Sequence, residues 1–200
     1  GLFKGSQPSR YIALAYLTGI LPIKRTMTQS ALNNFDEYTM LNPGPLASFI
    51  GFTEGEVKGL SNKYNIDFDR IKKWYDGYYL NHQHVYNPKA VVSLFTLGVF
   101  QSYWAQTSSY ESIHSLIQMN FDGLKEAVLE MLSGNEVKMQ TTSFQNDMVS
   151  FKNMDDVLTA LVHLGYLGYN QTYKTVFIPN EEIRQEFVNS VSEDKWNDLI

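Results

Sequence analysis

The sequence predicts a mainly helical α+β fold, and three observations predict it. Helix-start signals recur in the middle of the chain, as a capping pattern at Thr53 and Glu56 and an Asn87-Pro88 start. Near the C-terminal end, a helical stretch precedes two short alternating segments, which is typical of an antiparallel hairpin. A single long apolar run, residues 11–21, leads the chain.

Composition limits the class of protein further. The 200 residues are 44% hydrophobic and 14% aromatic, which is enough to build a core. The net charge is −5, with +3 on the first half and −8 on the second. This disfavours a generally basic nucleic-acid binder, and it suggests that a phosphate-bearing ligand would approach the first half; ordinary surface scatter is the alternative. The absence of cysteine excludes disulfide frameworks and thiolate nucleophiles.

The leading run, residues 11–21, is apolar on both alternating faces. Such a pattern suits a strand buried on two sides in a parallel sheet, although a buried helix shares it. No second run of this kind follows, so the chain cannot complete that sheet and we expect it to be part of a longer protein. Without its neighbours, the segment could also pair with a second copy of the chain. The run is too short to span a membrane and lacks a secretory cleavage pattern, so we expect a cytoplasmic protein.

Turn and helix-cap residues predict where helices begin and end in the middle of the chain. Asn42-Pro-Gly-Pro45 sets a sharp turn and a boundary near residue 42. The capping box predicts a helix to about Lys63, and a second helix over 67–75 ends before Gly77. Asn87 and Pro88 begin a third helix. Two more helices are expected over residues 110–118 and 122–132.

The last quarter predicts a different unit. A helix over 155–164 leads to strand-like segments at 166–170 and 175–178, and Asn180 then caps a final helix over 181–191. A helix followed by a hairpin is how a winged-helix unit ends.

Several stretches together resemble a bacterial family, the AAA-ATPase-like proteins with a C-terminal PD-(D/E)XK nuclease-type domain. In chain order they read Leu17-Thr-Gly-Ile20, Ser30-Ala-Leu-Asn-Asn34, Gly51-Phe-Thr-Glu54 with Glu56-Val57, Lys73-Trp-Tyr-Asp-Gly-Tyr78, Val85-Tyr-Asn-Pro88, Tyr103-Trp104 and Ile178-Pro-Asn-Glu-Glu-Ile-Arg184. Their order and spacing over residues 11–190 carry the resemblance.

The resemblance implies that the chain is the middle of such a protein. Residues 1–42 would be a remnant of the nucleotide-binding core, 43–133 a helical lid, and 134–200 a winged-helix-like unit. The partners would be the rest of the ATPase core before it and the nuclease-type domain after it. ATP and Mg are expected for the parent protein. The chain has no GxxxxGK sequence followed by Ser or Thr, so neither a catalytic residue nor a cofactor is expected within it.

By the same resemblance, Thr18 ends the core strand at the position that senses nucleotide. Its hydroxyl could contact a γ-phosphate or the attacking water, and Lys24 or Arg25 could supply positive charge. The alternative is that Thr18 only caps a strand end and that the two basic side chains lie in water.

The most distinctive string in the sequence, residues 74–78, is expected to act as a structural latch. Asp76 would satisfy turn amides before Gly77, and the aromatic side chains would lock neighbouring helices, so that nucleotide state passes to the lid by rigid packing. A binding or catalytic carboxylate at Asp76 is the alternative. The latch comprises Trp74, Tyr75, Asp76, Gly77, Tyr78, Tyr86, Asn87 and Pro88.

Two other motifs carry weaker chemical signals. His82 and His84 could ligate a metal with Asp76, but an i, i+2 pair in a polar loop is weak, and no metal site is expected. Glu136-Val-Lys138 has the local form of a nuclease motif without the strand context that the motif needs.

The predicted function is therefore that of a regulatory and coupling region, which is not catalytic alone. The alternative is a nucleic-acid-binding winged helix that inserts residues 155–164 into a groove. That helix has two acids and no Arg or Lys, so a nucleic-acid partner is disfavoured. A small hydrolase is disfavoured too, since no nucleophile and base can be paired.

Overall fold

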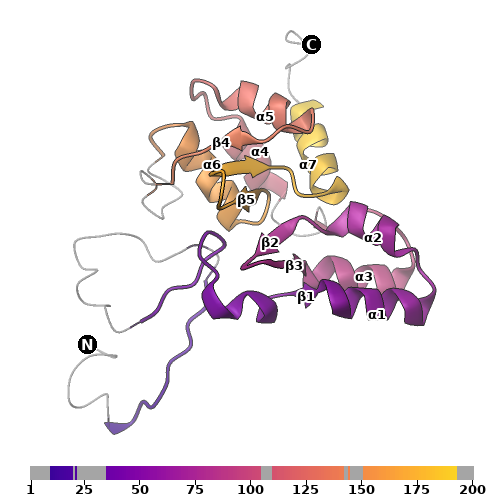
Figure 1. The fold of residues 1–200 in the computed structure, drawn as a ribbon. Coiled ribbons are helices and arrows are strands. Elements are labelled where there is room, and N and C mark those ends of the chain that lie inside the picture. Colours follow the sequence, from indigo (N-terminus) through magenta and orange to yellow (C-terminus); the bar gives the residue numbers. More distant parts are fainter. Residues whose placement is uncertain are drawn as a thin grey trace.

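The computed structural model describes residues 10–19, 21, 35–104, 110–141, 144 and 151–192. Within these ranges the chain is a mixture of helices and two small antiparallel sheets of three strands (Figure 1). The predicted α+β class is confirmed. None of the described helices is long and apolar enough to cross a membrane.

The first half forms one sheet with helices around it. The sheet has the order β1-β3-β2, and both pairings are antiparallel. The elements are the 3-10 helix η3 (Gly44–Phe49), β1 (Phe52–Thr53), α1 (Glu54–Tyr64), α2 (Phe68–Tyr75), β2 (Tyr78–Leu80), β3 (Gln83–Tyr86) and α3 (Pro88–Leu97).

Side-chain caps fix where these helices begin. The Thr53 hydroxyl accepts a hydrogen bond from the Glu56 amide, and the Glu56 carboxylate accepts one from the Thr53 amide at 2.8 Å. These bonds hold the pKa of Glu56 below its ordinary value. At α3, Asn87 accepts hydrogen bonds from the amides of Lys89 and Ala90. Both predicted helix starts are confirmed.

The hairpin of β2 and β3 is missing from the sequence prediction, which treated this stretch as a loop. Tyr78 pairs with Val85, and the turn residues Asn81 and His82 both have positive φ, at 48° and 62°. A two-residue turn of this kind usually contains glycine. Neither residue of this turn is glycine, so the sequence did not predict it.

The described residues of the second half form four helices and a second sheet, of order β4-β6-β5. The predicted order of helix, hairpin and helix near the C-terminal end is confirmed. The elements are α4 (Tyr110–Ile117), α5 (Leu124–Leu132), β4 (Val137–Lys138), α6 (Met154–His163), β5 (Gly168–Asn170), β6 (Thr175–Phe177) and α7 (Glu181–Ser192). Val137 and Lys138 pair with β6, but α5 and a turn precede them, so in the described residues no strand leads into Glu136 as the nuclease motif would need.

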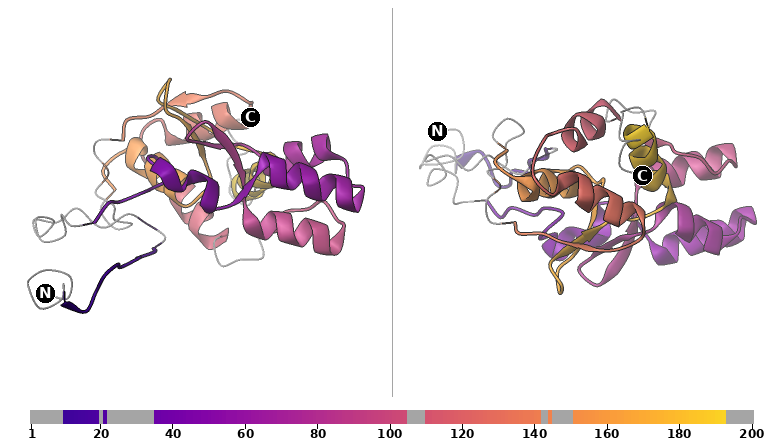
Figure 2. Two further views of the ribbon diagram at one scale, coloured as in Figure 1. Left: turned by 60° about the horizontal axis from the view of Figure 1, so that its bottom comes forward. Right: turned by 90° about the horizontal axis from the view of Figure 1, so that it is seen from above.

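Two large clusters of buried side chains make up most of the core of the described residues. Figure 2 shows the helices that these clusters join from two further sides. The first joins α1, α2 and α3 through Val57, Ile71 and Leu94. The second joins α4 and α5 to α6 and α7. The predicted boundary near residue 133 falls inside this second cluster, since α5 packs on α7 and β4. The domain limits stay a prediction.

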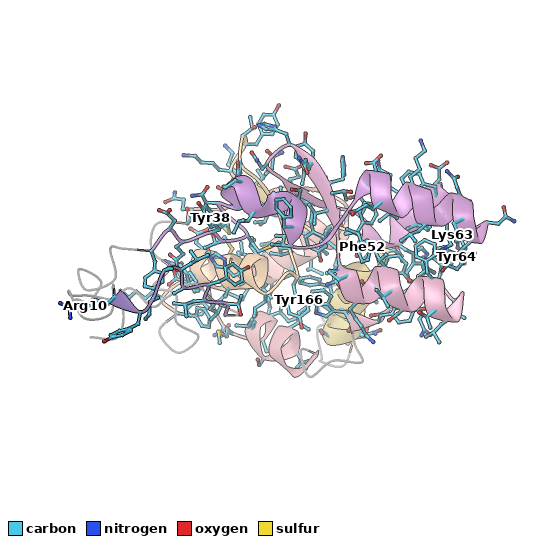
Figure 3. The ribbon with its side chains drawn as sticks, turned by 90° about the horizontal axis from the view of Figure 1, so that it is seen from below. Arg10, Tyr38, Phe52, Lys63, Tyr64 and Tyr166 are labelled. Atoms are coloured by element: carbon cyan, nitrogen blue, oxygen red, sulfur yellow. The ribbon has the colours of Figure 1, made fainter. Side chains whose placement is uncertain are left out.

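The leading apolar run does not form the expected strand or helix in its described part. Residues 11–19 have neither structure, and the segment extends away from the folded body (Figure 1). Arg10, at its outer end, lies on the opposite side of the molecule from Lys63 and Tyr64 (Figure 3). A strand needs a neighbour to pair its amides, and none of the described strands pairs with this segment.

The two halves meet at Gly77, between α2 and β2. Gly77 has φ +113°, and a Cβ built on it would lie 2.1 Å from the Pro179 carbonyl oxygen. The close approach leaves no room for a side chain, because the contacting atoms belong to backbone.

We expect Gly77→Ala to lower the free energy of unfolding by about 3 kcal/mol or more, from backbone strain and overlap with Pro179. The matched control is Gly98→Ala: Gly98 also has positive φ, at +69°, but its Cβ would meet nothing within 4 Å. The control should cost only about 1 kcal/mol. Urea unfolding measures both, and equal losses would contradict the importance of the Pro179 contact.

Candidate functional site

The latch residues come together around the β2–β3 hairpin. Residues 74–78 run from the end of α2 into β2, and residues 86–88 run from β3 into α3. The pairing of Tyr78 with Val85 brings the two stretches side by side.

Aromatic packing fixes the α2 side of this region. Tyr75 is fully buried, and its ring stacks on Phe100 with centroids 6.1 Å apart. The Tyr75 hydroxyl donates a hydrogen bond to the Gln101 carbonyl at 3.0 Å. Trp74 also contacts Phe100. The end of α2 is therefore held against the chain that follows α3.

Asp76 is buried, and it bonds to a turn amide as the sequence predicted. Its carboxylate accepts a hydrogen bond from the Gly77 amide at 2.7 Å. It also lies 2.9 Å from His84 Nδ1 and 3.8 Å from Lys72 Nζ. These contacts compensate the burial of a charged group.

A fourth charged side chain, Glu54, completes what we call the Asp76 cluster: Glu54, Lys72, Asp76 and His84. Glu54 Oε2 lies 3.5 Å from Lys72 Nζ and 4.0 Å from His84 Nε2. Ligand atoms of Glu54, Asp76 and His84 all lie within 4.8 Å of one another. These groups come from α1, the end of α2 and β3.

Of the two histidines, His84 lies beside Asp76 and His82 does not. His82 is exposed in the turn, where its ring contacts Tyr79. Glu54 takes its place beside His84, and no spacing pattern could reveal this, because the pairing of β1 with β3 is what brings the start of α1 to the hairpin.

Tyr86 is fully buried close to the Asp76 cluster. Its hydroxyl interacts with the Asp76 carboxylate, both through the charge and through a hydrogen-bonding contact. Burial raises the pKa of Tyr86, and the negative charges of Asp76 and Glu54 raise it further.

The Asp76 region is tied directly to the second half of the chain. Asn180 Nδ2 donates a hydrogen bond to the Asp76 carbonyl oxygen at 2.7 Å, and Asn180 Oδ1 accepts one from the Ile183 amide. The Tyr78 hydroxyl donates to the Gly165 carbonyl oxygen at 2.6 Å. One asparagine thus caps α7 and holds the end of α2.

Glu182, in the first turn of α7, makes a second connection. Its carboxylate is buried and accepts hydrogen bonds from the amides of Tyr103, at 2.7 Å, and Trp104, at 3.1 Å. Burial raises the pKa of Glu182 to about 7, an effect that these amides oppose and the charge of Glu186 reinforces. Glu186 in turn accepts a hydrogen bond from the Ser102 hydroxyl at 2.6 Å.

A cavity of about 200 Å³ opens between the β2–β3 hairpin and the end of α6. Its lining is mostly apolar and includes Leu80, Val85, Trp104 and His163. Burial lowers the pKa of His163 to about 4, so this imidazole is neutral near pH 7.

The predicted nucleotide-sensing residues lie apart from this region or outside the described residues. Thr18 is exposed within the segment that lacks helix and strand. Lys24 and Arg25 lie outside the described residues. Their sensing role stays a prediction.

The comparisons with known proteins identify no family for this chain. No protein family matches the chain, and no solved structure matches it. The chain is similar to a protein from Azotobacter chroococcum mcd 1 described as an uncharacterized protein in the vnfD 5′ region, at 29% identity over 101 residues. That match covers 50% of this chain but only 19% of the other protein.

The raised pKa of Glu182 predicts a pH-dependent stability. Between its ordinary value of 4.5 and about 7, the folded protein keeps a proton that the unfolded chain has lost, so the free energy of unfolding falls as pH rises. Glu182→Gln removes this titration and keeps the oxygen that accepts the two amide hydrogen bonds. From about pH 5 to about pH 8, we expect the variant to gain about 3 kcal/mol relative to the wild type.

Urea unfolding at both pH values measures this difference. The control is Glu181→Gln on the same helical turn, where the partly exposed carboxylate lies 3.9 Å from Arg184. Its difference from the wild type should change far less with pH. A Glu182→Gln difference that stays constant with pH would contradict the assignment.

Proposed function

We propose that the chain is the regulatory and coupling region of a larger AAA-ATPase-like protein, a helical lid followed by a winged-helix-like unit. In this proposal it acts through contacts with neighbouring parts of that protein and carries no complete active site. The observation that carries the proposal is the exposed apolar segment at residues 11–17.

The exposure of this segment is unusual for a folded chain. Tyr11, Leu14 and Tyr16 are 81%, 88% and 74% exposed, and Leu17 is 55% exposed. A contiguous apolar stretch left in water usually marks an interaction surface. The partner that fits is an apolar sheet edge, which would bury these side chains and pair their amides. In the proposal, that edge belongs to the nucleotide-binding core of the same protein.

The similarity to a much longer protein supports a role as one part of a larger molecule. In that larger molecule, the core would bind ATP and Mg, and Thr18, Lys24 and Arg25 would lie close to the phosphates. A nuclease-type domain would follow this chain, and the whole protein would be cytoplasmic.

The connections around Asp76 support the coupling role. A shift of α2 would reach α7 through the Gly77–Pro179 contact and through Asn180, which bonds to the Asp76 carbonyl. Glu182 ties the same helix to the amides of Tyr103 and Trp104. Packed backbone contacts of this kind move as a unit.

The burial of α6 favours this proposal over nucleic-acid recognition. All residues from 156 to 162 are buried, and Asp155 and Asp156 lie in the first turn. A recognition helix needs an exposed face with donors for base edges and phosphates.

The exposed segment should act in binding and contribute little to the stability of this chain. We expect the double variant Leu14→Asp with Tyr16→Asp to unfold within about 1 kcal/mol of the wild type, because both side chains are exposed. We also expect the wild type to self-associate at high concentration and the variant to remain monomeric. Urea unfolding and sedimentation velocity measure the two effects. A large loss of stability in the variant would show that the segment packs on its own fold.

The chain alone should not bind nucleotide. Equilibrium dialysis with a labelled ATP analogue and Mg²⁺ tests this, and we expect no saturable binding, because the chain lacks a phosphate loop whose amides and lysine would hold the phosphates. Micromolar binding would refute the proposal that the chain has no nucleotide site.

A further inference from the structure

The cavity between the β2–β3 hairpin and the end of α6 has the size of a small-molecule site. Its volume is about 200 Å³, and an apolar cavity of about 150 Å³ is enough to hold benzene. Close-packed protein interiors leave few voids larger than a water molecule. Pre-formed apolar pockets between two parts of a fold are the usual binding sites of small molecules. The cavity is therefore a candidate binding site.

Hydrogen bonds and ring contacts hold the walls of the cavity in place. The Tyr78 hydroxyl donates to the Gly165 carbonyl oxygen at 2.6 Å, which joins the hairpin to the end of α6. The Trp104 ring meets the Tyr166 ring edge-on, with centroids 5.7 Å apart. The Trp104 amide also donates a hydrogen bond to the Glu182 carboxylate at 3.1 Å. Walls fixed in this way relax little into an empty space, so the cavity stays open for a ligand.

The side chains that line the cavity favour an aromatic ligand. Tyr78, Tyr86 and Trp104 contribute to the lining, beside aliphatic side chains that include Leu80 and Val85. Aromatic rings pack on one another in offset or edge-on contacts, which stabilise a complex beyond the burial of apolar area alone. An aromatic ring thus fits both the size and the chemistry of the cavity.

The same lining disfavours a charged ligand. None of the described residues that line the cavity is Asp, Glu, Lys or Arg. The histidine of the lining is also uncharged near pH 7, because burial lowers the pKa of His163 to about 4. An ionic ligand would lose its hydration in the cavity without an opposite charge beside it, which costs free energy. An uncharged molecule has no such cost.

We propose that this cavity binds a small uncharged aromatic molecule of one or two rings. The molecule contacts the hairpin in the first half of the chain and the end of α6 in the second half. Because it binds only where the two meet, its binding stabilises the contact between the halves. This inference is independent of the function proposed above, because it rests on the cavity alone and on no neighbouring domain.

A titration of the whole chain with benzyl alcohol, followed by ¹⁵N NMR chemical shifts, tests the proposal. We expect saturable shifts of the amides that border the cavity, Leu80 and Gly165 among them, with a Kd of about 1 mM or lower. Benzoate and benzylammonium have the same ring and carry opposite charges. Both should bind about 10-fold or more weakly than the alcohol. The proposal is overturned if the alcohol shows no saturable binding, or if either ion binds as tightly.

Substitutions that fill the cavity locate the site. Ile50→Trp enlarges a lining side chain that is 46% exposed, so the fold tolerates it, and it should weaken binding of benzyl alcohol about 10-fold or more. Leu164→Phe fills the cavity from the α6 side and should act in the same direction. The matched control is Phe49→Trp, at the preceding residue, which is 81% exposed and lies outside the lining. It should bind like the wild type.

Circular dichroism establishes that each variant is folded. The proposal is overturned if neither filling variant weakens binding, or if Phe49→Trp weakens it equally. The double variant Leu14→Asp with Tyr16→Asp should bind benzyl alcohol like the wild type. Tighter binding by this double variant would show that the apolar segment of a second copy occupies the cavity, and it would also overturn the proposal.

Discussion

The junction of Asp76 and Gly77 is the constraint on which the rest of the structure depends. At this point the end of α2 touches the backbone before α7, and a Cβ on Gly77 would lie 2.1 Å from the Pro179 oxygen. Asn180 bonds to the Asp76 carbonyl and caps α7 through the Ile183 amide. Because both halves of the chain use the same few backbone groups, neither can shift there without the other.

Buried carboxylates on the two sides of this junction are stabilised in different ways. Asp76 lies beside the cationic side chain of Lys72 and the imidazole of His84, so its charge has partners. Glu182 has backbone amides and a neighbouring acid, so burial dominates and raises the pKa of its carboxyl. The charge of Asp76 is compensated by neighbouring side chains, whereas the protonation of Glu182 responds to pH. Both adjoin the connection between the halves.

The sequence predicted local structure well where a side chain bonds to its own helix end. The caps at Thr53 and Asn87 could be predicted because their hydrogen-bond partners lie within three residues in the sequence. The β2–β3 hairpin could not be predicted, since its short strands are joined by a turn of Asn81 and His82 that contains no glycine. The apolar pattern of residues 11–21 predicted a buried element, yet residues 11–19 form neither strand nor helix, because burial needs a partner that the pattern does not supply.

The sequence alone thus determined the fold class, the helix starts and the final order of helix, hairpin and helix, since these follow from contacts between near neighbours in the chain. Only the tertiary structure decided that Glu54 joins Asp76 and His84, and that the buried Tyr86 lies close to the Asp76 carboxylate. The physical reason is that strand pairing and helix packing bring together residues far apart in sequence, and no local periodicity encodes which of them will meet.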